Sequence, residues 1–370
     1  MRRLRKLGRW LTVLLVVLAV PALYIGVGCR GDAQFAITDQ PPVVSDAVRA
    51  ELAKLQTYKF PEEKSYLTFP EWYIVYASQD YADHIAQQRP SGFAYFTAAT
   101  EFWTSYCKVN RVSAARYSFN FGTQVMIYVI GVSHSAEFIL KGIYENTLGR
   151  IFELMAPGRP VDEEVFAHRF AHDYGQWLNT TPWYDFDFWG RLNTLWSDVP
   201  KSGDGLFRKW ERRLVLSAEL VFKSGYGALI GGGTNAAYAP AELEIRVLIS
   251  GQAAALAAVD SRIRIERDFG DGTVLAVIPR YQPFTEIALK LAQTPMRFVE
   301  VGGNHRMFMS LRVKDQWKAP QTFPVAMFEV FVLAPGGGRR IGLDVPIADV
   351  LSTIAAAQSS GAVVEHVYDY

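Results

Sequence analysis

Residues 135–144 read Ser-Ala-Glu-Phe-Ile-Leu-Lys-Gly-Ile-Tyr, and residues 217–226 read Ser-Ala-Glu-Leu-Val-Phe-Lys-Ser-Gly-Tyr. The two segments share five of ten residues, and most of the other positions are apolar in both. Apolar residues interrupted by polar ones four positions apart are typical of an amphipathic helix. The match, 82 residues apart, is first interpreted as a chance similarity over ten positions, and a duplicated unit of two or three helices is the alternative.

The shared polar residues fall on one face of each helix, because positions three and four apart lie on the same side. This face is either solvated, or it pairs with the matching face of the other helix. For an antiparallel pair, we predict that Glu137 lies beside Lys223 and that Lys141 lies beside Glu219. The polar residues of the two faces are His134, Glu137, Lys141, Tyr144, Glu219, Lys223 and Tyr226.

The segments around them, residues 125–143 and 214–232, are each 19 residues long and largely apolar. That length approaches the ~20 residues that cross a bilayer as a helix. A charged side chain near the bilayer centre, however, costs roughly 2.5–3.5 kcal/mol on insertion scales. We therefore expect a helical domain outside the membrane with a paired interior, and a three-span transport or relay component is an alternative.

Further helical patterns, rich in aromatic residues, surround these two segments. They predict a helical domain over residues 62–240, interrupted by breaks such as Arg89-Pro90-Ser91-Gly92. We expect the run Gly231-Gly232-Gly233 to end the last helix. The predicted helices cover residues 66–85, 93–109, 122–155, 162–178, 183–196 and 206–230.

Residues 241–370 have a different pattern, in which alternating and β-branched runs dominate. Phe269-Gly270-Asp271-Gly272 predicts a hairpin turn, because glycine tolerates the positive φ of such turns. Helical patterns at 283–292 and 347–358 interrupt the strands. The order of elements predicts an α+β domain, a ferredoxin-like or related sandwich. The predicted strands are 262–267, 273–278, 297–301, 307–313, 325–333, 341–345 and 362–368.

The N-terminus predicts a membrane anchor. Residues 10–28 are 19 residues without a charge, longer than the ~7–15 apolar residues of a cleavable signal. Basic residues precede them and keep that end in the cytoplasm, so the body lies on the opposite side. We expect an inner-membrane protein with a flank and anchor at 1–28, a linker at 29–61 and a periplasmic body. The basic residues are Arg2, Arg3, Arg5, Lys6 and Arg9.

Cys29 and Cys107 are the two cysteines of the chain, which excludes a framework of several disulfides. Cys29 follows Val27 and Gly28 at the end of the apolar run, and this resembles a lipoprotein processing site. Lipidation of Cys29 is therefore an alternative way to hold the body at the membrane. We expect Cys107 to be a small apolar residue of the core.

Glu164, His168 and His172 are spaced four apart on one predicted helix face. Two imidazoles one turn apart bind divalent metals, and a carboxylate a further turn away supplies a third ligand. The glutamate that follows the first histidine in metalloprotease helices is absent from this segment. An ordinary polar surface is therefore the first interpretation, and a divalent metal site is the alternative.

The charge distribution limits which classes of binding partner we expect. The chain has 38 Lys and Arg against 37 Asp and Glu, and the body without the five N-terminal basic residues has 33 against 37. This balance predicts no nucleic-acid partner. We expect a membrane-tethered cell-envelope protein that binds a lipid or an envelope protein. The sequence does not decide whether it is an enzyme, and a metal-dependent enzyme that uses His168 and His172 is the rival hypothesis.

Overall fold

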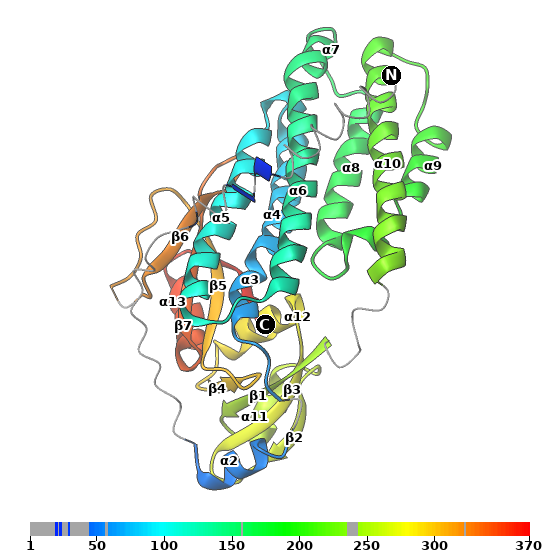
Figure 1. The fold of residues 1–370 in the computed structure, drawn as a ribbon. Coiled ribbons are helices and arrows are strands. Elements are labelled where there is room, and N and C mark those ends of the chain that lie inside the picture. Colours follow the sequence, from blue (N-terminus) through cyan, green and yellow to red (C-terminus); the bar gives the residue numbers. More distant parts are fainter. Residues whose placement is uncertain are drawn as a thin grey trace.

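The computed structural model describes residues 19–20, 22–23, 29, 44–55, 58–156, 158–234, 243–321 and 323–370 (Figure 1). The described chain is helical up to Thr234 and then forms two antiparallel sheets, so the predicted α+β class is confirmed. The predicted anchor, apart from four of its residues, and all of residues 30–43 lie outside the described residues.

Two consecutive triplets of helices make up the helical part. In each triplet a 3-10 turn separates the first two helices, η2 (Pro90–Gly92) in the first and η4 (Trp183–Asp185) in the second. The last helix of the first triplet continues through a π turn (Glu145–Gly149) into α7 (Arg150–Leu154). The triplets are α4 (Phe69–Gln87), α5 (Tyr95–Arg116) and α6 (Phe121–Tyr144), then α8 (Asp162–Trp177), α9 (Phe188–Ser197) and α10 (Leu206–Thr234).

Matching contacts 93 residues apart show that the triplets repeat one local structure. Tyr81 and Phe93 have ring centroids 5.3 Å apart, and the rings of Tyr174 and Phe186 are also 5.3 Å apart. In α4, Nε2 of His84 lies 3.0 Å from the Arg89 carbonyl, five residues further along the chain. The equivalent Trp177 Nε1 donates to a carbonyl five residues on at 3.2 Å.

The repeat extends to the third helix of each triplet. Trp103 Nε1 of α5 donates to Ser135 Oγ of α6 at 2.8 Å. Trp196 Nε1 of α9 donates to Ser217 Oγ of α10 at 2.9 Å. Both serines open the ten-residue match found in the sequence, so the duplicated unit, the alternative interpretation of this match, has a structural counterpart of three helices per unit.

The two triplets run in opposite directions. Gln79 Nε2 of α4 donates to the Gly175 carbonyl of α8 at 3.2 Å. Ten residues later, just after α4 ends, Arg89 lies 3.5 Å from Glu164, near the start of α8. The contacts between α6 and α10 show the same reversal. Reciprocal contacts of this kind relate two copies by an approximate two-fold axis, as in an isologous dimer. The helical part is therefore an inverted repeat within one chain.

The C-terminal part contains two four-stranded sheets with the orders β2-β3-β1-β4 and β6-β7-β5-β8, and all neighbouring strands are antiparallel. Gly270 and Gly272 have φ values of 75° and 85° in the predicted hairpin turn. The elements are β1 (Glu244–Ser250), α11 (Ala253–Val259), β2 (Arg264–Asp268), β3 (Thr273–Pro279), α12 (Gln282–Leu291), β4 (Arg297–Val301), β5 (Arg306–Val313), β6 (Ala326–Phe331), β7 (Arg339–Pro346), α13 (Val350–Ser359) and β8 (Val363–Tyr368).

The helical and α+β parts share one aromatic core. The ring of Phe69 in α4 packs against the rings of Phe328 in β6 and Phe308 in β5, with centroids 4.9 and 5.5 Å apart. Beside this core, the buried guanidinium of Arg340 donates to Asp80 of α4 at 2.9 Å. These contacts fix the first triplet on the second sheet.

Two expectations about segment ends differ from the structure. The glycine run does not stop the last helix, because α10 continues to Thr234. A short helical pattern near residues 44–55 of the predicted linker forms α2 (Asp46–Leu52), but this helix is not a free linker, because its buried Val48 packs with Leu248 and Leu275 of the first sheet. The apolar residues of this segment explain the difference, because they cover a sheet face that would otherwise be exposed.

Candidate functional site

Four charged side chains meet between α6 and α10. Lys141 Nζ donates to Glu137 at 2.9 Å and to Glu219 at 2.7 Å. Lys223 Nζ donates to Glu137 at 3.1 Å. The predicted antiparallel pairing of Glu137 with Lys223 and of Lys141 with Glu219 is therefore confirmed. We name these four residues the charge tetrad.

The charge tetrad lies under two tyrosine rings, one from each triplet. Lys141 Nζ is 5.1 Å from the ring centroid of Tyr81, and Lys223 Nζ is 4.6 Å from that of Tyr174. These are cation–π distances, and they occupy equivalent places in the repeat. The exposed fraction of the side chains falls from 32% for Glu137 to 9% for Lys223. The tetrad is thus partly buried, and it is not a solvated face.

The other polar residues predicted on these faces also turn inward. His134 is buried among aromatic rings, with Nε2 3.4 Å from the Ala98 carbonyl. Tyr144 donates to Glu211 of α10, and the hydroxyls of Tyr226 and Ser133 are 2.8 Å apart. Six of the seven predicted residues therefore lie along the interface between α6 and α10, and His134 packs inside the first triplet.

A second group of charges, which sequence reasoning missed, extends the interface toward the start of α10. Its three arginines are buried, and each donates to a buried glutamate from another helix or turn. The signal in the sequence was the density of charges in residues 208–213, at the head of an otherwise apolar helix. The pairs are Arg212 with Glu145 at 2.8 Å, Arg208 with Glu164 at 2.8 Å and Arg213 with Glu163 at 3.0 Å.

Glu164, His168 and His172 do not meet as metal ligands. Glu164 accepts from Arg208 at 2.8 and 3.0 Å, and it caps its own helix by accepting from the Val161 N–H. His172 lies on the surface with 67% of its side chain exposed, while burial lowers the pKa of His168. Within the ranges that the structure describes, no three His, Cys, Asp or Glu side chains form a group that could hold a metal ion. The metal hypothesis has no ligand set in this geometry.

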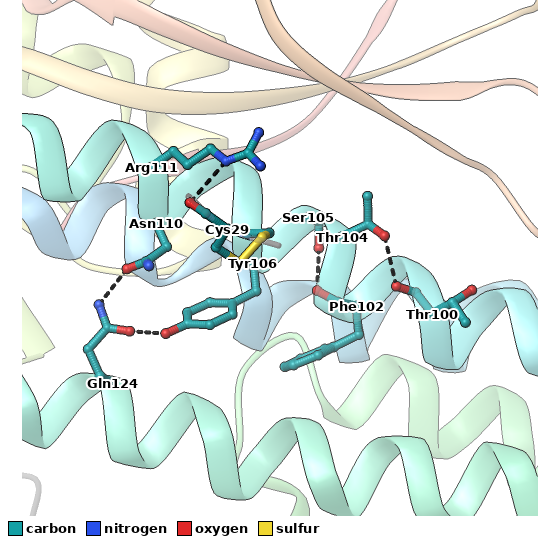
Figure 2. Close-up of a disulfide and its surroundings, with 10 residues drawn as sticks. Cys29, Thr100, Phe102, Thr104, Ser105, Tyr106, Asn110, Arg111 and Gln124 are labelled. Atoms are coloured by element: carbon teal, nitrogen blue, oxygen red, sulfur yellow. Dashed lines mark hydrogen bonds between the residues drawn. A yellow bond between two sulfur atoms is a disulfide. The ribbon is translucent and has the colours of Figure 1, made fainter. Parts of the chain in front are cut away.

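Cys29 and Cys107 form a disulfide, which corrects two expectations from the sequence (Figure 2). Cys107 is not a free apolar residue of the core, and a Cys29 sulfur in this bond cannot also carry a lipid thioether. Arg111 Nε holds the same junction by donating to the Cys29 carbonyl at 3.0 Å. Cys29, the residue directly after the apolar N-terminal run, is therefore fixed to the side of α5.

The outer surface of α6 and α10 is apolar. Every exposed residue of α6, and of α10 up to Leu229, is apolar, whereas the ionisable residues of both helices point inward. Exposed residues of α4 and α8 are mainly polar, for example Asp83, Arg169 and Gln176. We name the exposed residues of the two helices the α6–α10 surface; its large members include Val125, Val129, Leu140, Ile143, Leu214, Val221, Phe222 and Leu229.

The helix from Phe121 to Leu154, which joins α6 to α7, is long and apolar enough to cross a membrane, and it alone passes this test among the described residues. Only 33% of its most apolar window is buried inside the protein. Large exposed apolar patches on proteins mark contacts with membranes or with other proteins. The geometry therefore combines a paired, charged interior with an uncovered apolar exterior.

The interior can do two things chemically. It fixes the register of the helices, because an ion pair that slips by one turn leaves charges unpaired in a dry interior. The carboxylates, amines and hydroxyls of this interior also have the composition of a proton relay. No family model, curated protein or solved structure matches the chain.

Proposed function

We propose that this chain is a membrane-tethered cell-envelope protein that acts by binding lipid, with the α6–α10 surface seated in the outer leaflet of the inner membrane. The observation that carries the proposal is the distribution of charge on two helices of 24 and 29 residues. Their exposed residues are apolar and their ionisable residues are paired inside. In water this arrangement leaves a large apolar surface uncovered, whereas acyl chains would cover it.

The position of Cys29 supports the bilayer as the partner. The predicted anchor ends one residue before it, and the disulfide holds Cys29 against α5. α5 packs directly on α6. An anchor that leaves the bilayer at residue 28 therefore brings α6 close to the membrane surface. A disulfide also favours the oxidising, periplasmic side, where the basic N-terminus places the body.

For the α+β part, we propose a ferredoxin-like arrangement of the first sheet. Its support is the antiparallel order β2-β3-β1-β4, with α11 between β1 and β2 and α12 between β3 and β4. This is the connectivity of a split βαβ unit. The second sheet has the corresponding order and retains α13 in place of the second helix.

The experiment is photocrosslinking of the full chain in its native membrane. A photoreactive residue replaces Leu140 or Phe222 on the α6–α10 surface, or Gln176 on α8 as the exposed control. We expect lipid adducts at the first two positions and none at the third. Adducts at all three in equal amount would contradict the proposal, as would a crosslink at Leu140 or Phe222 to a second copy of the chain.

A second candidate function is a transport or relay component, in which α6 and α10 cross the bilayer. The observation that favours it is the inverted repeat with charges at its interface, which is typical of secondary transporters. The structure selects the position that separates the two candidates. A reporter near Asp185 does not separate them, because Trp183 stacks on Tyr226 with ring centroids 5.2 Å apart, which places this turn at the C-terminal end of α10. A reporter inserted at Gly203, just before α10 begins, does separate them.

The reporter at Gly203 should be active outside the cytoplasm if the helices lie on the membrane, and in the cytoplasm if they cross it. A second reporter after Tyr370 should be active outside the cytoplasm in both cases. Cytoplasmic activity of the reporter after Tyr370 would overturn the orientation itself.

A further inference from the structure

A hollow of about 420 Å³ opens at one end of the helical part, where the end of α4, the turn η2 and α7 meet. Its location is set by the π turn, which carries α6 on into α7 beside the loop between α4 and α5. The lining residues are Gln88, Arg89, Ser91, Gly92, Arg150, Glu153 and Leu154.

The one acidic residue of the lining already has donors. Glu153 accepts from the Ser91 N–H at 3.1 Å and from the Ser91 hydroxyl at 2.5 Å. Arg208 Nη2 lies 3.6 Å from the same carboxylate, whose side chain is 8% exposed. Arg208 lies closer to Glu164, at 2.8 Å, so it offsets the charge of Glu153 only in part, and the binding of an anion depends on the arginines of the lining.

The basic residues of the lining face solvent. Arg150 is exposed and has no hydrogen-bond or ion-pair partner in the ranges that the structure describes. The side chain of Arg89 is 43% exposed and lies 3.5 Å from Glu164, a carboxylate that accepts more closely from Arg208. Guanidinium groups offer a planar fork of donors that matches the oxygens of a phosphate.

The other wall of the hollow is apolar and continuous with the α6–α10 surface. Leu154 lines the hollow and is 84% exposed, and Ile151, on the same short helix, is 55% exposed. Leu148 of the π turn, 54% exposed, connects them to Ile143 of α6. A ligand held here meets cationic donors at one end and an apolar helix face at the other.

We infer that this hollow binds the phosphate of an anionic phospholipid, with Arg150 and Arg89 as donors and the acyl chains along Leu154 and Ile151. The inference rests on the proposed function, because the lipid reaches the hollow from a bilayer at the α6–α10 surface. A free phosphate shares the recognition chemistry, and the experiment separates the two.

The experiment is native mass spectrometry of the full chain in mild detergent, with added phosphatidylglycerol, phosphatidylcholine or inorganic phosphate. We expect the wild type to retain more phosphatidylglycerol than phosphatidylcholine. We expect Arg150→Gln to reduce the amount of bound phosphatidylglycerol about tenfold, as for the loss of one charge-assisted contact. Arg159→Gln is the matched control, because that arginine is also exposed and pairs with Asp204 outside the hollow.

Three results would overturn the inference: equal retention by the wild type and Arg150→Gln, equal retention of the two lipids, or displacement of phosphatidylglycerol by millimolar phosphate. The last result would assign the hollow to a free anion. Lipid crosslinking at Leu140 tests the proposed function separately. If the Leu140 adduct forms while Arg150→Gln does not change lipid retention, the hollow is not a lipid site, but the proposal that the α6–α10 surface lies in the bilayer is retained.

Discussion

Glu137 is the residue on which the tetrad depends most, because both lysines donate to it. Replacing it by lysine puts three ammonium groups around Glu219. We expect Glu137→Lys to lower the free energy of unfolding by about 3 kcal/mol, the lower end for a broken buried pair, since the side chain is partly exposed. Adding Lys223→Glu should recover much of the loss, because opposite charges face each other again. Denaturant titration of the purified chain measures both effects.

The control for this swap is an ion pair that solvent surrounds. Arg159 and Asp204 lie 2.7 Å apart with 77% and 74% of their side chains exposed. Arg159→Glu should change stability by only about 0–1 kcal/mol. Strict additivity of the two changes in the tetrad, or an equal cost at Arg159, would show that the tetrad does not hold the helices together.

Glu71, in the first turn of α4, makes stability depend on pH. Burial raises the pKa of its carboxyl to about 7, from 4.5 in the unfolded chain, although the charge of Lys64 opposes the shift. The folded state therefore holds an extra proton between these values, and the free energy of unfolding falls as pH rises from 4.5 to 7. Glu71→Gln should flatten this decline and be about 1–3 kcal/mol more stable than the wild type at pH 8.

Urea titrations at half-unit pH steps measure the profile. A decline that remains below pH 6 in Glu71→Gln reports Asp369, because burial raises its pKa to about 6. An unchanged slope between pH 6 and 7 in the variant would contradict the assignment to Glu71.

At single positions, the sequence predicted the four paired charges of the tetrad but none of the arginine–glutamate pairs beside it. Helical spacing identified Glu137, Lys141, Glu219 and Lys223, because their pattern repeats on two helices. The sequence did not predict the pairing of Arg208, Arg212 and Arg213, because their glutamate partners come from segments with no fixed spacing to α10. For the same reason Glu164 was interpreted as part of a polar surface, with a metal site as the alternative, whereas its partner Arg208 lies 44 residues away in the sequence.

At the scale of elements, the disulfide fastens the end of the predicted anchor to α5 across a sequence separation of 78 residues. Cross-linking a loop of this length reduces the entropy of the unfolded chain. We expect Cys107→Ser to lower the free energy of unfolding by about 2–4 kcal/mol. A reducing agent should have the same effect on the wild type and none on the variant. Two free thiols in the unreduced wild type would contradict the bond.

Most helices and strands were predicted closely, but β1 and α11 were missed, and the extent of the repeat was not predicted. α5 has 22 residues and its counterpart α9 has 10, so the offset between the triplets falls from 93 to 82 after these helices. A comparison at one fixed offset finds only the ten residues on α6 and α10. The equivalent rings of α4 and α8 become visible only when both helices are folded.

In the molecule as a whole, the charge tetrad and the apolar α6–α10 surface have one explanation in common. Helices that face lipid on one side must place their ionisable residues on the other, and an inverted repeat supplies each charge with an opposite partner. The α+β part packs on the first triplet through aromatic rings, so it moves with the helices. The sequence indicated the membrane from its N-terminus, but the exposure of α6 and α10 required the packed structure.

The proposed function requires that the α6–α10 surface lies in lipid. Nitroxide labels at Leu140, Leu214 and His172 of the full chain, in phosphatidylglycerol–phosphatidylcholine vesicles, test it by collision with oxygen, which concentrates in lipid, and with a water-soluble nickel chelate. We expect the first two labels to collide mainly with oxygen and the His172 label, on the polar side of α8, mainly with nickel. Nickel collision rates at Leu140 and Leu214 as high as at His172 would contradict the claim.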